Sequence, residues 1–132
     1  MTYFFLEAHS GWSGIVLLLI LITGIKALVG WLGNQKWKKI DSQLMLFSQI
    51  SVRVQFVLGL ILFILLQKWN GGMAFIGSHV IPGILAVGAV EFGAARAKKS
   101  KGKQKFMFAF IGMILALILV YGALATVGGL FA

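Results

Sequence analysis

Residues 11–31 read GWSGIVLLLILITGIKALVGW, and Lys26 is the only charged residue among them. The hydrocarbon core of a bilayer is about 30 Å thick, and a helix needs about 20 apolar residues to cross it. Within that core every backbone N–H and C=O must be paired inside the segment, which a helix achieves. A secretory signal would begin with Lys or Arg, whereas the residues before this run carry Glu7. We therefore expect a permanent transmembrane helix over residues 11–31.

Three further apolar runs follow, over residues 44–66, 79–95 and 106–130. The third span is the shortest and has Pro82 near its start, where a missing N–H costs little because the first turn of a helix leaves its N–H groups unpaired. Short links make consecutive helices antiparallel. The sequence thus predicts an all-α fold, in which residues 1–132 form one integral membrane domain built as a four-transmembrane-helix up-down bundle.

The composition agrees with a membrane protein and excludes several chemistries. Of the 132 residues, 60% are hydrophobic and 11% are charged, and the mean hydropathy is +0.98. The absence of cysteine excludes disulfides, cysteine-ligated zinc, iron–sulfur clusters, a thiol nucleophile and haem attached through cysteine. The sequence also has no phosphate-binding glycine loop, paired carboxylates or Ser-His-Asp set, so hydrolysis and phosphoryl transfer are not expected.

The placement of the cations predicts the topology. A net charge of +9 would suggest nucleic acid in a soluble domain, but nine of the 12 Lys and Arg residues lie in the links 34–43 and 96–105. The link 67–78 contains only Lys68. Because positive residues in short loops stay in the cytoplasm, we expect a multi-pass protein of the bacterial inner (cytoplasmic) membrane with both termini outside, surrounded by lipid and without a nucleic-acid partner. Tryptophans near the expected span ends fit this topology, since indole favours the headgroup region: Trp12, Trp31, Trp37 and Trp69.

The two histidines are the main candidates for a cofactor site. His9 and His79 fall at the outer ends of the first and third spans, which run parallel in this topology, so they should lie at similar depth. A b-type haem takes two axial nitrogen ligands from facing helices, which makes these residues candidate metal ligands. Gly83 belongs to a face of small side chains after His79 that could admit a flat macrocycle. Trp12 could pack on the edge of the ring or anchor the chain at the interface.

The same residues are also compatible with a protein that binds no haem. Small side chains at helical spacing let membrane helices approach one another closely, and histidines are common near the membrane surface. A chlorophyll-type magnesium needs only one histidine. The chain could then be a non-catalytic structural or pigment-binding accessory subunit of a larger respiratory or photosynthetic membrane complex.

Several short motifs resemble a known group of proteins. They are His9-Ser10-Gly11-Trp12, Gly30-Trp31, Asp41, Gln55 with Leu58-Gly59-Leu60, and His79. Together they resemble small bacterial four-helix membrane proteins described as cytochrome b-like. The sequence departs from that pattern at Ser78 and Val80, where the family has an acidic residue and a proline, and at Ser13 and Gly14, where it tends to have an arginine. The resemblance implies haem b bound non-covalently between the two histidines. It also implies electron transfer to redox partners or other membrane subunits rather than catalysis of bond chemistry.

Three charged residues in the spans require a partner or a route to water. Lys26 lies close enough to the end of its span to reach the interface without a partner. Arg53 lies near the midplane, where a lone guanidinium is costly, and Glu91 is the acidic residue expected within a span. We predict a buried ion pair between Arg53 and Glu91, with Lys26 as the other possible partner of the carboxylate. Such a pair would fix helix register, and a proton or ion pathway is the alternative. The glutamines Gln49 and Gln55 could hydrogen bond to Arg53 or to a quinone oxygen.

Overall fold

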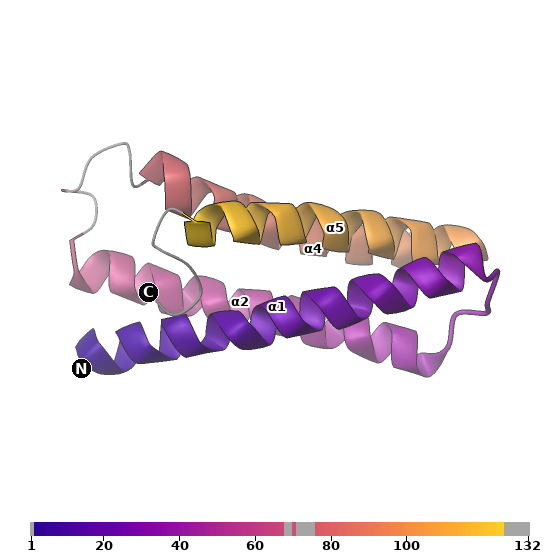
Figure 1. Ribbon diagram of the computed structural model, residues 1–132, viewed down its shortest axis with the longest axis horizontal. Coiled ribbons are helices and arrows are strands. Elements are labelled where there is room, and N and C mark those ends of the chain that lie inside the picture. Colours follow the sequence, from indigo (N-terminus) through magenta and orange to yellow (C-terminus); the bar gives the residue numbers. More distant parts are fainter. Residues whose placement is uncertain (1, 68–69, 71–75, 126–132) are drawn as a thin grey trace.

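A computed structural model of the chain describes residues 2–67, 70 and 76–125. It contains four long helices, α1 (Thr2–Leu32), α2 (Lys39–Leu65), α4 (Ile81–Lys99) and α5 (Lys103–Ala125), and a single π-helical turn, η2 (Ile76–Val80), leads directly into α4. Within the described residues the fold has no strand. Figure 1 shows the four helices running side by side along the length of the molecule.

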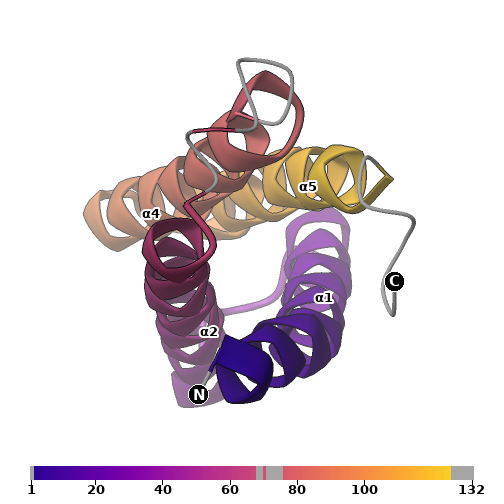
Figure 2. The ribbon, with the colours of Figure 1, turned by 90° about the vertical axis from the view of Figure 1, so that its left-hand side faces the viewer.

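The helices form an up-down bundle, as the sequence predicts. Each helix packs against two neighbours, so that α1, α2, α4 and α5 follow one another around a ring (Figure 2). Each of the four, with η2 counted as part of the third, is long and apolar enough to cross a membrane. The chain is therefore a multi-pass membrane protein built as an all-α four-helix bundle.

The helices extend beyond the predicted spans. The first begins at Thr2 rather than near Gly11, so His9 lies within α1 and not ahead of it. The third span begins with η2 at Ile76, and Pro82 occupies the first turn of α4, where its missing N–H is tolerated. The predicted end of the fourth span, as well as Lys68 and Trp69, lies outside the described residues.

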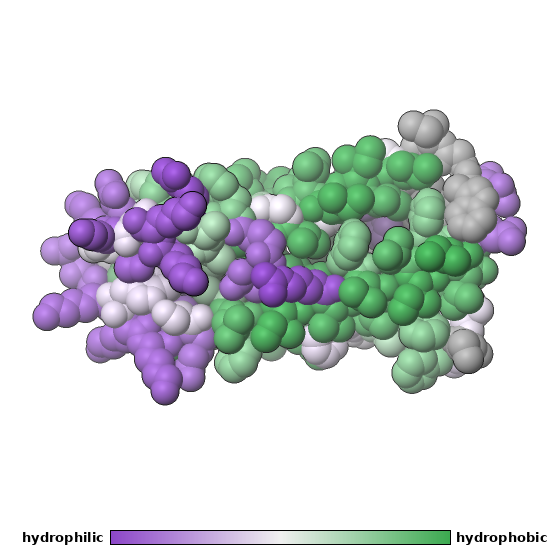
Figure 3. Space-filling view, turned by 180° about the vertical axis from the view of Figure 1, so that it is seen from behind, coloured by the Kyte–Doolittle hydropathy of each residue, from purple (hydrophilic) through white to green (hydrophobic). Residues whose placement is uncertain are grey.

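The two basic links lie at the same end of the bundle. One joins α1 to α2 and the other joins α4 to α5. Figure 3 shows hydrophilic side chains gathered at this end and a broad apolar surface over the middle of the molecule. The opposite end holds the N-terminus of α1, the turn η2 and the C-terminal part of α5 (Figure 1).

The closest packing in the bundle is between α4 and α5. A Cβ on Gly112 would lie 2.7 Å from Cα of Gly93 and 2.8 Å from the carbonyl oxygen of Ala89. Ala109 and Ala116 of α5 are fully buried on the same face. Small residues allow membrane helices to approach until their backbones touch, and this contact fixes α4 against α5.

Polar contacts join α1 to α2 along the bundle interior. The hydroxyls of Thr23 and Ser48 lie 2.9 Å apart. Lys26 does not extend to the interface without a partner, which corrects the prediction from the sequence, because its Nζ lies 2.7 Å from Oδ1 of Asp41. Asp41 sits in the first turn of α2, where its other oxygen accepts a 2.8 Å hydrogen bond from the backbone N–H of Lys38. The carboxylate is buried, so the ammonium supplies the countercharge that burial requires.

Candidate functional site

A cavity of about 380 Å³ lies inside the bundle at the end away from the basic links. Its volume falls within the range of about 300–1,000 Å³ that is typical of small-molecule sites. All four helices and η2 contribute to its walls, which are mainly apolar. The lining residues with polar side chains are few: His9, Ser10, Ser13, Gln55 and His79.

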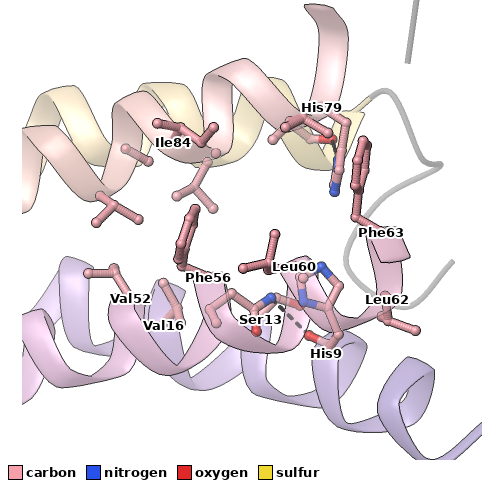
Figure 4. Close-up of a pocket in the computed structure, with 18 of the residues that line it drawn as sticks. His9, Ser13, Val16, Val52, Phe56, Leu60, Leu62, Phe63, His79 and Ile84 are labelled. Carbon is pink, nitrogen blue, oxygen red and sulfur yellow. Dashed lines mark hydrogen bonds between the residues drawn. The ribbon is translucent and has the colours of Figure 1, made fainter. Parts of the chain in front are cut away.

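The two histidines face each other across this cavity. His9 projects from α1 and His79 from η2, and Figure 4 shows both rings directed into the space between the helices. Their ring centroids are 6.3 Å apart, and the ring planes are inclined by 75°. The structure therefore brings together the two candidate ligands that lie far apart in the sequence.

The separation of the rings matches that of two imidazoles on one metal ion. A histidine nitrogen binds a metal at about 2.0–2.1 Å. The centre of the ring lies about 1 Å beyond that nitrogen, so two rings on opposite sides of a metal have centroids about 6 Å apart. The described residues contain no group of three or more His, Asp or Glu that could hold a bare ion. Two histidines would be enough to hold a haem, because its macrocycle supplies four further nitrogens to the iron.

A backbone hydrogen bond orients His79. Its Nδ1 lies 2.9 Å from the carbonyl oxygen of Ala123 on α5. Since a carbonyl can only accept, Nδ1 carries the proton and donates it. A neutral ring protonated at Nδ1 has its lone pair on Nε2, and ligating histidines are commonly oriented by such a bond to a carbonyl.

His9 lies in a close-fitting recess formed by α2. A Cβ on Gly59 would lie only 3.1 Å from Cε1 of His9, so the ring occupies its place because position 59 has no side chain. Nε2 of Gln55 donates a 2.9 Å hydrogen bond to the backbone carbonyl of His9. Nδ1 of His9 and Oε1 of Gln55 are buried without a hydrogen-bond partner among the described residues. Unpaired buried polar atoms are costly, and both of these atoms belong to residues that line the cavity.

Part of the cavity wall lies between α2 and α4. Phe56 and Leu60 of α2 and Ile84 of α4 line the cavity there and are exposed side chains. Figure 4 shows these three side chains between the two helices.

The remaining residues predicted to contact a cofactor are Gly83 and Trp12, and only one of the two lines the cavity. Gly83 does so. Trp12 does not: its Nε1 donates a 2.8 Å hydrogen bond to the carbonyl of Ser51, which ties α1 to α2. The expectation that Trp12 packs against a cofactor therefore has no support in this geometry.

Sequence reasoning missed the apolar walls of the cavity and the recess at Gly59. Phe56, Leu60 and Phe63 line the site, but α2 is apolar on most of its circumference. In such a helix the hydropathy pattern does not separate cavity-facing from lipid-facing positions. Only the motif Leu58-Gly59-Leu60 pointed to the recess, because a glycine within an apolar membrane helix often marks a position where another part of the protein packs closely against that helix.

The predicted pair of Arg53 and Glu91 is present, but it is not buried. Nε of Arg53 lies 2.7 Å from Oε1 of Glu91, and Nη2 lies 2.9 Å from Oε2. Nε2 of Gln49 donates a third hydrogen bond, of 3.0 Å, to the same carboxylate. The Arg53 side chain is 56% exposed and that of Glu91 is 34% exposed. The expectation of burial was wrong because both residues project from the outer edge of the α2–α4 contact, while Val52 and Val90 occupy the interior beside them.

Comparison with known protein families, with curated proteins and with solved structures found no match to this chain.

Proposed function

We propose that this chain is a small b-type cytochrome-like membrane protein, which binds one haem non-covalently through His9 and His79 and transfers electrons. The observation that carries the proposal is the 6.3 Å separation of the two rings across a cavity formed by all four helices. When bound, a haem held by His9 and His79 would supply one-electron redox chemistry.

The residues of the cavity suit such a ligand. His79 is oriented by its bond to the Ala123 carbonyl, and Gly59 and Gly83 leave space where side chains would otherwise stand. The apolar walls would exclude water from the iron and so influence its reduction potential. The buried Nδ1 of His9 and the buried Oε1 of Gln55 are a potential donor and a potential acceptor.

The absorption spectrum of the purified protein tests this proposal. Protein expressed with a haem supply should show a Soret band and, after reduction, the narrow visible bands of a b-type cytochrome. His9→Ala and His79→Ala should each remove these bands, whereas Leu18→Ala, an exposed position on α1, should keep them. A pure and helical wild-type protein that stays colourless with haem present would refute the proposal.

The site would lie toward the outer side of a bacterial cytoplasmic membrane. Both basic links lie at the end of the bundle opposite the cavity, and positive loops are retained in the cytoplasm. An electron partner would then approach from the outer face. Because the chain has no cysteine, single cysteines report topology cleanly. In intact spheroplasts, an impermeant maleimide should label Thr2→Cys and leave Lys101→Cys unlabelled until the membrane is opened, and the reverse pattern would refute this orientation.

A further inference from the structure

An ion pair on the outer surface of a membrane bundle is unexpected. Arg53 lies midway along α2, and Glu91 lies within α4 at the adjoining surface. Figure 3 shows hydrophilic side chains interrupting the apolar surface on the face formed by these two helices. Charged residues at membrane depth nearly always face protein or a water-filled cavity, because exposure to hydrocarbon is costly. This face therefore needs a covering that offers polar partners.

The pair has hydrogen-bonding capacity left over. A guanidinium carries five N–H donors, and the two bonds to Glu91 involve one on Nε and one on Nη2. The carboxylate accepts from Arg53 and Gln49, yet a third of its side chain is still exposed. Whatever covers the face should present both an acceptor for Arg53 and a donor for Glu91.

The surface around Glu91 allows close approach of another helix. Gly88, one turn before it, and Ala95, one turn after it, are both exposed. Apart from its chain neighbours and its own helix backbone, a Cβ on Gly88 would meet no atom of the described residues within 4 Å. The small size of residue 88 is therefore not required by packing within the chain, whereas small residues beside a polar contact are typical of helix–helix interfaces in membranes.

We propose that a second copy of this chain covers the face of α2 and α4, forming a two-fold symmetric dimer. Two copies in the same orientation in the membrane can be related by a two-fold axis along the membrane normal, and such an axis keeps equivalent residues at equal depth. It places α2 of one copy opposite α4 of the other. Arg53 of each copy then faces Glu91 of the other, so the two intrachain pairs join into a ring of four alternating charges.

The same contact has a consequence for the cavity. Phe56, Leu60 and Ile84 line the cavity between α2 and α4 and are exposed beside the face that the second copy would cover. Dimerisation would cover this part of the cavity wall. The dimer does not depend on the haem proposal, since it follows from the outer surface alone.

Charge variants separate contacts between copies from contacts within one copy. Arg53→Glu alone, or Glu91→Arg alone, places like charges together both inside each copy and across the two-fold axis. When the two variants are co-expressed with different affinity tags, both carboxylates of one copy face both guanidinium groups of the other, although neither copy regains its own pair. In lipid nanodiscs we expect pull-down of the second tag to fall at least tenfold for each single variant and to recover for the mixture. Wild-type chains that do not pull each other down, single variants that still do, or a mixture that fails to recover would each overturn the proposal.

Glycine variants provide a test that does not disturb the charges. Gly88→Leu adds bulk to the proposed interface at a position where an added Cβ meets no neighbouring helix within 4 Å, and Gly122→Leu makes the same change at an exposed glycine of α5. Gly88→Leu should be monomeric in native mass spectrometry with unchanged helicity, while Gly122→Leu should remain dimeric. Equal dimer content in the two variants would overturn the proposal. A wild-type complex that contains one copy of this chain and a different membrane protein would also overturn the proposal.

Discussion

Replacing Gly59 with alanine should displace the imidazole of His9, because α2 lies directly against the ring at this position. The new Cβ would be 3.1 Å from Cε1, 3.7 Å from Nδ1 and 3.8 Å from Nε2 of His9. Carbon atoms in favourable contact are about 3.5–4.0 Å apart, so the ring or the helix has to move by about 0.5 Å. Metal–ligand distances are held to within about 0.2 Å. A displacement of this size is therefore large enough to weaken coordination.

The expected loss of haem affinity for Gly59→Ala is about 10- to 100-fold, the usual effect of disturbing residues that orient a metal ligand. This corresponds to about 1.4–2.8 kcal/mol of binding free energy. Titration of apoprotein with haemin, followed at the Soret band, measures it. Gly14→Ala is the matched control, since it makes the same change on α1 at a position where a Cβ meets nothing within 4 Å. If the two variants bind haem equally well, the reasoning about the recess is wrong.

Two further predictions concern the bundle itself. Gly112→Ala should lower the free energy of unfolding in detergent by about 1–3 kcal/mol, because the added Cβ meets backbone atoms of α4 that can move only if the helices separate. Gly122→Ala should not lower it, and equal melting temperatures for these two variants would contradict this account of the α4–α5 contact. Asp41→Asn should cost about 1 kcal/mol by leaving the partly buried ammonium of Lys26 without its countercharge, and adding Lys26→Met should recover part of that loss. Chemical unfolding of the single and double variants measures this coupling, and additive effects would argue against it.

The number and order of the helices could be predicted because membrane insertion imposes strong rules. Runs of about 20 apolar residues must be helical in lipid, and short links force neighbours to be antiparallel. The ends were less well predicted: α1 continues to Thr2 through Glu7 and His9, since a helix extends past the hydrocarbon wherever its residues permit. Hydropathy alone does not mark that extension.

The orientation of residues around each helix was the harder problem. Val52 is buried and Val54 is exposed, although the two side chains are identical. In a soluble protein polarity would distinguish these faces, but in lipid both faces are apolar. The partnership of Arg53 with Glu91 could be predicted because charges at membrane depth need partners, whereas their position on the outer surface could not.

The pairing of His9 with His79 could be predicted, because the chain has two histidines and the topology places both at the outer ends of parallel spans. Equal depth was expected from the parallel directions of the first and third spans, and the structure brings the rings to face one cavity. The details that shape the site come from tertiary contacts: the carbonyl of Ala123 at His79 and the recess that Gly59 provides for His9. Neither contact has a signature in the local sequence.

Electron paramagnetic resonance of the ferric, haem-loaded protein tests the central claim most directly. Two histidine ligands should give a low-spin spectrum. This signal should be absent from His9→Ala and from His79→Ala. A high-spin signal in the wild-type protein, or a low-spin signal that survives loss of either histidine, would contradict the assignment of these two residues as the axial ligands.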